Sequence, residues 1–170
     1  IDRFFNVLKD HDRKEAYINF GGGEPLLNWS VMISAIEYCK KMYAKDFTIV
    51  FSVNTNGSLI DEYKARKIKE YNVKVAISLD GLEVANDKVR VYKTGNGTFK
   101  SIIRAMDIFC SIEYDIVGFS TTVNERNFCH IDEKIVDFAL ERQLREIRID
   151  LDVIHMLNIP ISGAIQELLK

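Results

Sequence analysis

Strand-like runs rich in β-branched and aromatic residues alternate with helical patterns along the chain, and this alternation most constrains the fold. The strand-like runs lie at 16–20, 47–53, 73–79, 115–123 and 146–153. Helical patterns lie at 29–44, 60–71, 98–112, 131–143 and 162–169. Such alternation is typical of parallel strands joined by right-handed helical crossovers. No repeat or linker interrupts it, so the sequence predicts one α/β domain over 1–170.

Each predicted strand has one apolar face and one small or polar face. The apolar positions are Ile18, Phe20, Ile49, Phe51, Val53, Val75, Ile77, Leu79, Val117, Phe119, Ile147, Ile149, Leu151 and Val153. The polar positions include Asn19, Ser52, Asn54, Ser78, Asp80, Ser120, Thr122, Asn124, Arg148, Asp150 and Asp152. A closed eight-stranded barrel has an apolar interior, and a doubly wound sheet is apolar on both faces. The pattern instead favours an open, curved barrel with a wet concave face. An antiparallel sheet with one solvated face is the alternative, which the long helical connections disfavour.

Charge and cysteine content exclude several classes of function. The net charge of −2 indicates neither a nucleic-acid nor an anionic-membrane partner, and no apolar run approaches the ~20 residues of a membrane span. The cysteines, Cys39, Cys110 and Cys129, form neither a metal-ligand spacing nor a disulfide framework. We expect a cytoplasmic protein, with Cys39 and Cys110 packed in the core along apolar helix stripes. His11, His130 and His155 are too scattered to form a ligand pair.

The first strand-like run ends in Gly21-Gly22-Gly23-Glu24-Pro25. Glycines leave the backbone open to a ligand, and the carboxylate beside them suits an amino group better than a phosphate. Three further strand ends carry small polar residues: Asn54-Thr55-Asn56-Gly57, Ser78-Leu79-Asp80-Gly81 and Thr121-Thr122-Val123-Asn124. Each segment alone is typical of a turn. Four of them on successive strands indicate one functional rim.

This array resembles the radical S-adenosylmethionine (radical SAM) superfamily, most closely its peptide- and protein-modifying branch of anaerobic sulfatase-maturating enzymes and SPASM-type peptide maturases. Residues 20–27 (FGGGEPLL) are similar to the branch's FGGEPLL segment, residues 55–57 to its TNG segment and residues 77–81 to its ISLDG segment. Asp87, Arg90, Gly95, Gly97, Thr98 and Phe99 match its D-x-x-R…G-x-G-T-F pattern. The resemblance implies a partial TIM-type (β/α)6 barrel over a radical SAM core domain.

The resemblance also implies roles for individual residues. Gly22, Gly23 and Glu24 would bind the amino group of SAM. Ser78 would contact the methionyl carboxylate or ribose, and Asn54 stands near the same ligand. Thr122 and Asn124 would lie near the ribose and adenine, as would Val123. Asp80 and Arg90 would either contact a ligand or form an ion pair that holds the 81–97 loop. Asp150 and Asp152 are possible substrate or lumen residues, the alternative being an Arg148–Asp150 ion pair.

The chain departs from the family pattern in two places. Asn86 stands where the family often has His. The C-x3-C-x2-C motif that binds the family's 4Fe–4S cluster does not occur in this sequence, so no metal ligand is assigned to this chain. We therefore expect a truncated piece that lacks the first strand of the barrel and the cluster loop. We also expect the chain by itself to be inactive.

The resemblance implies an enzyme that uses a 4Fe–4S cluster to cleave SAM to a 5′-deoxyadenosyl radical and then modifies a peptide or protein side chain. A reductant such as flavodoxin or ferredoxin is the implied partner, and an auxiliary-cluster (SPASM) domain is a possible neighbour. One alternative is a degenerate, cluster-free binding module without catalysis. The other is an unrelated α/β-barrel enzyme that would use an acid–base pair drawn from Glu24, Asp80, Asp150 and Asp152.

Overall fold

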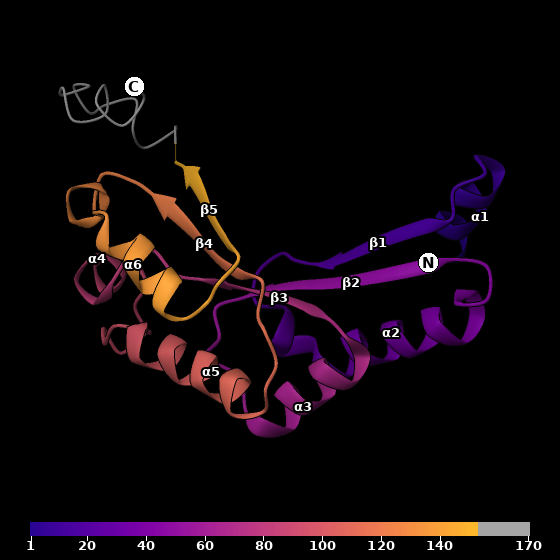
Figure 1. The fold of residues 1–170 in the computed structure, drawn as a ribbon, viewed down its shortest axis with the longest axis horizontal. Helices are drawn as coiled ribbons and strands as arrows, with labels where there is room; N and C mark the ends of the chain where they lie inside the picture. Colours follow the sequence, from indigo (N-terminus) through magenta and orange to yellow (C-terminus); the bar gives the residue numbers. More distant parts are fainter. Residues whose placement is uncertain (153–170) are drawn as a thin grey trace. The chain divides into compact units, whose positions relative to one another are not determined.

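The computed structural model describes residues 1–152, which divide into two compact units (Figure 1). The first unit comprises Ile1–Ser78 and Ser101–Gly118, and the second comprises Leu79–Lys100 and the chain from Phe119 onward. The predicted helix at 162–169, Val153 at the end of the last predicted strand, and His155 lie outside the described residues.

The first unit is built on three parallel strands, β1 (Glu15–Phe20), β2 (Thr48–Thr55) and β3 (Lys74–Ser78). In their register Phe20 lies opposite Val53, and Thr55 lies opposite Ile77. Its helices are α1 (Asp2–Asp10), α2 (Trp29–Tyr43), α3 (Glu62–Tyr71) and most of α5 (Phe99–Ser111), with a short 3-10 turn, η1 (Pro25–Asn28). Helices α2 and α3 lie on the same side of β1 and β2 (Figure 1).

Local chemistry explains where these helices begin and end. Asp61 caps α3 by accepting a hydrogen bond from the amide of Lys64 at 2.8 Å, and Asn72 ends the helix in the left-handed conformation. Pro25 takes the first position of η1, where a missing amide donor costs nothing. Two hydroxyl groups of α2, from Tyr38 and Tyr43, each donate to Asp2 Oδ1 of α1 at 2.7 Å.

The second unit contains β4 (Gly118–Val123), whose first residue belongs to the first unit, and β5 (Glu146–Leu151). Its helices are α4 (Glu83–Val89) and α6 (Lys134–Glu141), with a 3-10 turn, η2 (Phe128–His130). The strands β4 and β5 run in the same direction (Figure 1). Within each unit the hydrogen-bonding order of the strands follows the chain, β1-β2-β3 in the first and β4-β5 in the second. The predicted strand–helix alternation is therefore confirmed for the described residues.

The apolar strand face is confirmed for β2 and β3. Phe51 and Val53 of β2, and Val75 and Ile77 of β3, are buried. Ile36 of α2 and Ile68 of α3 are buried in the same unit. On the opposite face Asn19 is exposed, and Ser52, Asn54 and Ser78 are half-buried. The alternation of burial along β2 and β3 matches side chains pointing to opposite faces of a sheet.

Two predictions about burial are wrong. Ile149 and Leu151 of β5 were expected on a covered apolar face, but they are 57% and 55% exposed. The described chain ends one residue after this strand, and no later described element covers it. Cys110 was expected in the core but is exposed, because it lies beside the buried stripe of α5 that Ile102, Met106 and Phe109 form. Cys39 is buried, as predicted.

Helix α4 forms in the segment 81–97, which the sequence pattern treated as a loop. Within the part of the chain that the structure describes, every helix is too short or too polar to span a bilayer.

Candidate functional site

The glycine-rich segment after β1 presents open backbone. Gly22 has a φ of +101°, a conformation that residues with a side chain rarely adopt. A Cβ atom placed on Gly22 or Gly23 would meet no other atom within 4 Å, so nothing in the first unit crowds these peptide groups. Gly21, Gly22 and Gly23 are exposed, so a ligand can reach the backbone of this turn.

Glu24 connects this segment to the end of β2. Its Oε1 accepts hydrogen bonds from the amide of Leu26 at 3.1 Å and from Thr55 Oγ1 at 2.7 Å. Its Oε2 accepts one from the amide of Asn56 at 2.8 Å. Thr55 Oγ1 in turn accepts from the amide of Gly57 at 3.1 Å. One carboxylate thus caps η1 and fixes the turn that follows β2.

The polar residues on the exposed strand face pair across neighbouring strands. Ser78 Oγ of β3 donates to Asn54 Oδ1 of β2 at 3.3 Å, and Ser52 Oγ donates to Asn19 Oδ1 of β1 at 3.0 Å. The structure therefore brings Asn54 and Ser78 together, and both were predicted site residues. Thr55 and Asn56 were not among the predicted site residues, although the TNG segment that contains them was recognised.

A cavity of about 320 Å³ lies beside the glycine-rich turn. It is lined by residues of the β1 end, η1 and α2: Asn19, Phe20, Gly21, Gly23, Glu24, Pro25, Asn28, Val31, Met32 and Ala35. The negative charge of Glu24 and the open carbonyls at Gly22 and Gly23 suit an ammonium group. The residues present therefore fit the methionyl amino group of SAM.

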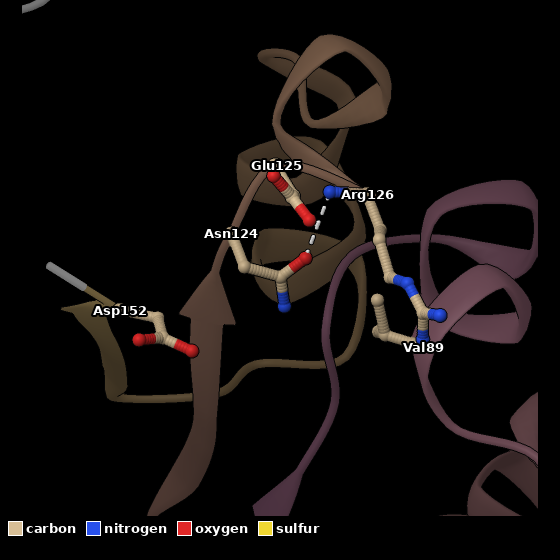
Figure 2. A pocket seen from close by; sticks show the side chains of 5 residues that line it. All are labelled: Val89, Asn124, Glu125, Arg126 and Asp152. Carbon is tan, nitrogen blue, oxygen red and sulfur yellow. Dashed lines mark hydrogen bonds between the residues drawn. The ribbon is translucent and has the colours of Figure 1, made fainter. Parts of the chain in front are cut away.

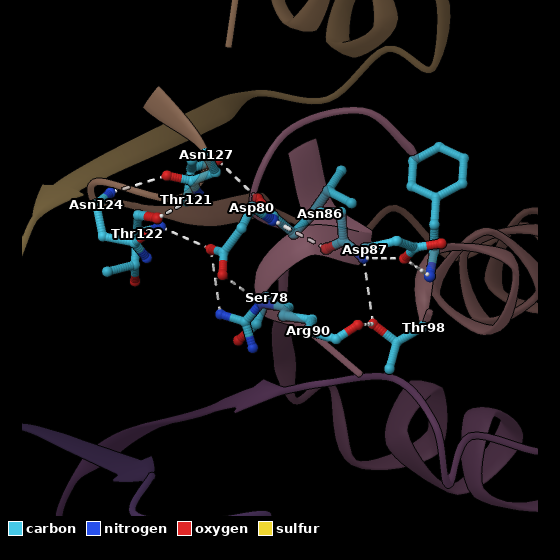
Figure 3. A network of polar contacts seen from close by, with 12 residues as sticks. Ser78, Asp80, Asn86, Asp87, Arg90, Thr98, Thr121, Thr122, Asn124 and Asn127 are labelled. Carbon is cyan, nitrogen blue, oxygen red and sulfur yellow. Dashed lines mark hydrogen bonds and ion pairs between the residues drawn. The ribbon is translucent and has the colours of Figure 1, made fainter. Parts of the chain in front are cut away.

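In the second unit, Asp80 is the centre of a polar network (Figure 3). Asp80 is 4% exposed, and its Oδ1 accepts from the amide of Thr122 at 2.7 Å and from Arg90 Nη2 at 3.2 Å. Arg90 Nε lies 2.7 Å from Asp80 Oδ2. Of the two interpretations left open by the sequence, the Asp80–Arg90 ion pair is the one that the structure shows.

Asn86 and Asp87 extend this network along α4 (Figure 3). Asn86 is fully buried, accepts from the amide of Asp80 at 3.1 Å, and donates to Asp87 Oδ1 at 2.8 Å and to Thr98 Oγ1 at 3.2 Å. Asp87 Oδ1 also accepts from the amide of Phe99 at 2.9 Å. A Cβ on Gly97 would overlap the Asp87 carboxylate, so only glycine fits there. Three residues of the D-x-x-R…G-x-G-T-F pattern, Asp87, Gly97 and Phe99, thus contact one another in the structure.

The end of β4 borders a second cavity, of about 420 Å³ (Figure 2). It is lined by Val89, Asn124, Glu125, Arg126 and Asp152, and so it brings together two predicted residues, Asn124 and Asp152. Asn124 Oδ1 accepts from the amide of Arg126 at 2.9 Å, as Figure 2 shows, which fixes the orientation of its carboxamide. Glu125 and Arg126 were not predicted, since an exposed charged pair in a loop gives no distinct sequence signal.

Asp150 lies apart from this cavity. Its Oδ2 is 2.9 Å from Arg148 Nε, and both side chains are largely exposed. The Arg148–Asp150 ion pair is thus present, as the alternative interpretation of Asp150 held. An exposed pair of this kind contributes little to stability.

The described residues do not fit an iron–sulfur cluster. Cys39 lies on α2, Cys110 on α5 and Cys129 in η2. Among residues 1–152, no three His, Cys, Asp or Glu side chains are grouped as a metal site would require.

Comparisons with known proteins agree with this geometry. An uncharacterised protein of Methanocaldococcus jannaschii is 38% identical over 79% of this chain and 46% of its own length. A cysteine-type anaerobic sulfatase-maturating enzyme of Clostridium novyi is 35% identical over 74% of this chain and 33% of its own length. The chain thus spans less than half the length of these relatives.

A solved structure, native anSMEcpe with bound AdoMet and Kp18Cys peptide, superposes with a TM-score of 0.74 at 25% identity, covering 82% of this chain and 38% of that one. This similarity confirms the predicted fold class, a partial TIM-type barrel of the radical SAM kind. The family model described as the radical SAM superfamily matches residues 1–138. The chain therefore belongs to the radical SAM superfamily, whose members use SAM with a 4Fe–4S cluster.

Proposed function

We propose that this chain is the SAM-binding part of the core domain of a radical SAM enzyme that modifies a peptide or protein side chain. The observation that carries the proposal is the pair of hydrogen bonds that Glu24 accepts from Thr55 and Asn56, beside the open backbone of Gly22 and Gly23. A carboxylate and the exposed backbone of the glycines thus lie together after the end of β1. Family membership and the sulfatase-maturating relatives support the reaction class.

In this proposal the first unit holds the methionyl end of SAM. Gly22 and Gly23 accept hydrogen bonds from the amino group through their carbonyls, and Glu24 supplies the neighbouring negative charge. Ser78 offers its hydroxyl and Asn54 its carboxamide to the carboxylate or ribose of SAM. The two side chains are already hydrogen-bonded to each other. In the second unit Thr122 and Asn124 bind the ribose and adenine, and Asp152 contacts the substrate.

A 4Fe–4S cluster, when bound, would supply the electron for reductive cleavage of SAM. The described cysteines lie on three separate elements, so we propose that this chain of 170 residues does not itself cleave SAM. A cytoplasmic location, a flavodoxin- or ferredoxin-type reductant and a SPASM-type auxiliary domain complete the proposal. They are supported by the family resemblance.

The test uses the full-length protein, purified and reconstituted with iron and sulfide without oxygen. After reduction with dithionite, electron paramagnetic resonance spectra are recorded with and without SAM. The proposal expects a reduced-cluster signal that changes on adding SAM, and release of 5′-deoxyadenosine. A protein that assembles no cluster but binds SAM is a binding module without catalysis. Turnover that needs neither iron nor SAM indicates an unrelated barrel enzyme.

A Gly23→Val variant makes this test specific to the glycine-rich turn. Valine fills the open space next to the backbone, so we expect the SAM-dependent spectral change to disappear while the cluster signal itself remains. Lys100→Val is the control, because Lys100 is an exposed residue of α5 that lies in the other unit. Equal spectra for the wild type and Gly23→Val contradict the assignment of the turn to SAM.

A further inference from the structure

The polar groups of Asp80 are bonded to other residues of the second unit. Its two carboxylate oxygens receive three contacts, one from the amide of Thr122 and two from the guanidinium of Arg90. Its own amide is bonded to Asn86. With 6% of its side chain exposed, the carboxylate has little surface to offer to a ligand.

The end of β4 is held from two sides by buried side chains. The Thr122 amide donates to Asp80, and the Thr122 carbonyl accepts from Asn127 Nδ2 at 2.9 Å. Asn127 is fully buried, and its Oδ1 accepts from the amide of Asn124 at 2.8 Å. Thr122 and Asn124 therefore have their backbone positions set by Asp80 and Asn127.

Stability alone is a weak explanation for this arrangement. Removing a carboxylate and a guanidinium from water costs about as much as their attraction returns, and apolar residues of similar size are often as stable in their place. A buried pair of charges does fix geometry, because any displacement leaves a charge unpaired. Asp80 and Arg90 thus restrict the end of β4 to one position.

We propose that Asp80 is a positioning residue: with Arg90 and the amide of Thr122, it holds the end of β4 in the form that binds the nucleoside part of SAM. This inference rests on the proposed function, and it gives Asp80 a role distinct from ligand contact. Preorganisation of this kind lowers the cost of ordering the binding residues when the ligand arrives.

The test combines ligand affinity with a measurement on the ligand-free protein. The full-length protein, reconstituted without oxygen, is compared with Asp80→Ala, Arg90→Gln and the double variant. The dissociation constant of SAM is measured by equilibrium dialysis. Hydrogen–deuterium exchange of the Thr122 amide is measured without SAM. Glu83→Gln is the matched control, because Glu83 is an exposed acid on α4.

The inference expects three results. Asp80→Ala raises the dissociation constant of SAM at least about tenfold, the effect of losing one charged hydrogen bond. The same variant speeds exchange of the Thr122 amide by at least about tenfold, since that amide loses its acceptor. The double variant binds SAM no more weakly than Asp80→Ala, because both substitutions remove the same Asp80–Arg90 ion pair. Glu83→Gln matches the wild type in both measurements.

Other results overturn the inference. Weaker binding with unchanged Thr122 exchange makes Asp80 a direct ligand contact. Faster exchange with unchanged affinity makes the network a support of the fold only. If the wild type itself does not bind SAM, the proposed function fails, and the inference fails with it. If circular dichroism shows that Asp80→Ala is unfolded, Asp80→Asn and Arg90→Lys take the place of the two variants, and smaller shifts in the same directions are expected.

Discussion

Glu24 reaches from the end of β1 to the turn after β2, where its Oε2 accepts a hydrogen bond from the amide of Asn56 at 2.8 Å. The same carboxylate also accepts from Thr55, so it joins Glu24 to residues that lie 31 and 32 positions further along the chain. The contact explains why a GGE segment and a TNG segment occur together in this chain: the acid of the first orders the turn of the second.

Replacing Glu24 is therefore expected to loosen both strand ends. In Glu24→Gln the side-chain nitrogen cannot accept from the amide of Asn56, so one half-buried donor loses its partner at a cost of about 1–2 kcal/mol. Urea denaturation monitored by circular dichroism measures this loss. Glu15→Gln, at the exposed start of β1, serves as control and is expected to change stability by less than about 0.5 kcal/mol. Identical denaturation midpoints for the two variants would contradict a stabilising role of the hydrogen bonds that Glu24 accepts.

Gly97 and Gly23 are expected to respond oppositely to substitution by alanine. At Gly97 the new Cβ overlaps the Asp87 carboxylate, and Asp87 is held in place by hydrogen bonds from Asn86 and from the amide of Phe99. We expect Gly97→Ala to lose about 2–4 kcal/mol of unfolding free energy. Gly23→Ala meets open space, so its stability should stay within about 0.5 kcal/mol of the wild type. Equal denaturation midpoints for the two alanine variants would contradict the crowding at Gly97.

Asn86 is expected to tolerate no acid. Its carboxamide donates to both Asp87 and Thr98, and a carboxylate in Asn86→Asp can donate to neither. We expect a loss of about 2–4 kcal/mol at neutral pH, because two acidic groups then face each other in a buried place. Thermal unfolding followed by fluorescence is the measurement, and Asn96→Asp at an exposed position is the control. If Asn86→Asp unfolds at the same temperature as the wild type, the hydrogen bonds of Asn86 do not stabilise this unit.

The contact between α1 and α2 predicts a dependence of stability on pH. Hydrogen bonds from Tyr38 and then Tyr43 lower the pKa of Asp2 from its ordinary value of 3.8. A carboxyl with a lowered pKa in the folded state stabilises the fold above its unfolded pKa, and this contribution is lost as pH falls through the folded pKa. The hydrogen bond to Asp2 raises the pKa of both tyrosines, so ionisation of the hydroxyls ends the contribution only at strongly alkaline pH.

The measurement is the midpoint of thermal unfolding of the wild type and Asp2→Asn across the pH range. We expect a constant difference around neutral pH that shrinks below about pH 3.8. Asp10→Asn, at the other end of α1, should show no such convergence. A difference that stays constant into strong acid would argue against the hydroxyl contacts to Asp2.

Strand and helix order could be predicted from the sequence because apolar periodicity is strong in this chain. The runs at 16–20 and 73–79 correspond to β1 and β3, and the pattern at 98–112 corresponds to α5. Helix α4 was missed because its seven residues, EVANDKV, carry no apolar stripe long enough to recognise. The exposure of Ile149 was missed for a different reason: alternation shows which residues share a face and not whether that face is covered.

The candidate site could be predicted as a set of segments, but its internal contacts could not. Sequence reasoning placed Glu24 near a ligand, whereas the structure shows that its oxygens already receive three hydrogen bonds. Asn127 carried no sequence signal, yet its buried carboxamide holds the end of β4. Side chains that bind other parts of the chain and those that bind ligands use the same polar groups. Only geometry separates the two roles.

The pairing of β1, β2 and β3 in chain order has a consequence for biosynthesis. As the ribosome releases the chain from its amino end, β2 emerges after β1 and β3 after β2, so each new strand meets an edge that already exists. Each strand of this trio pairs with a strand from the neighbouring strand–helix segment of the chain. The sheet of the first unit can therefore assemble in the same order in which its strands are synthesised.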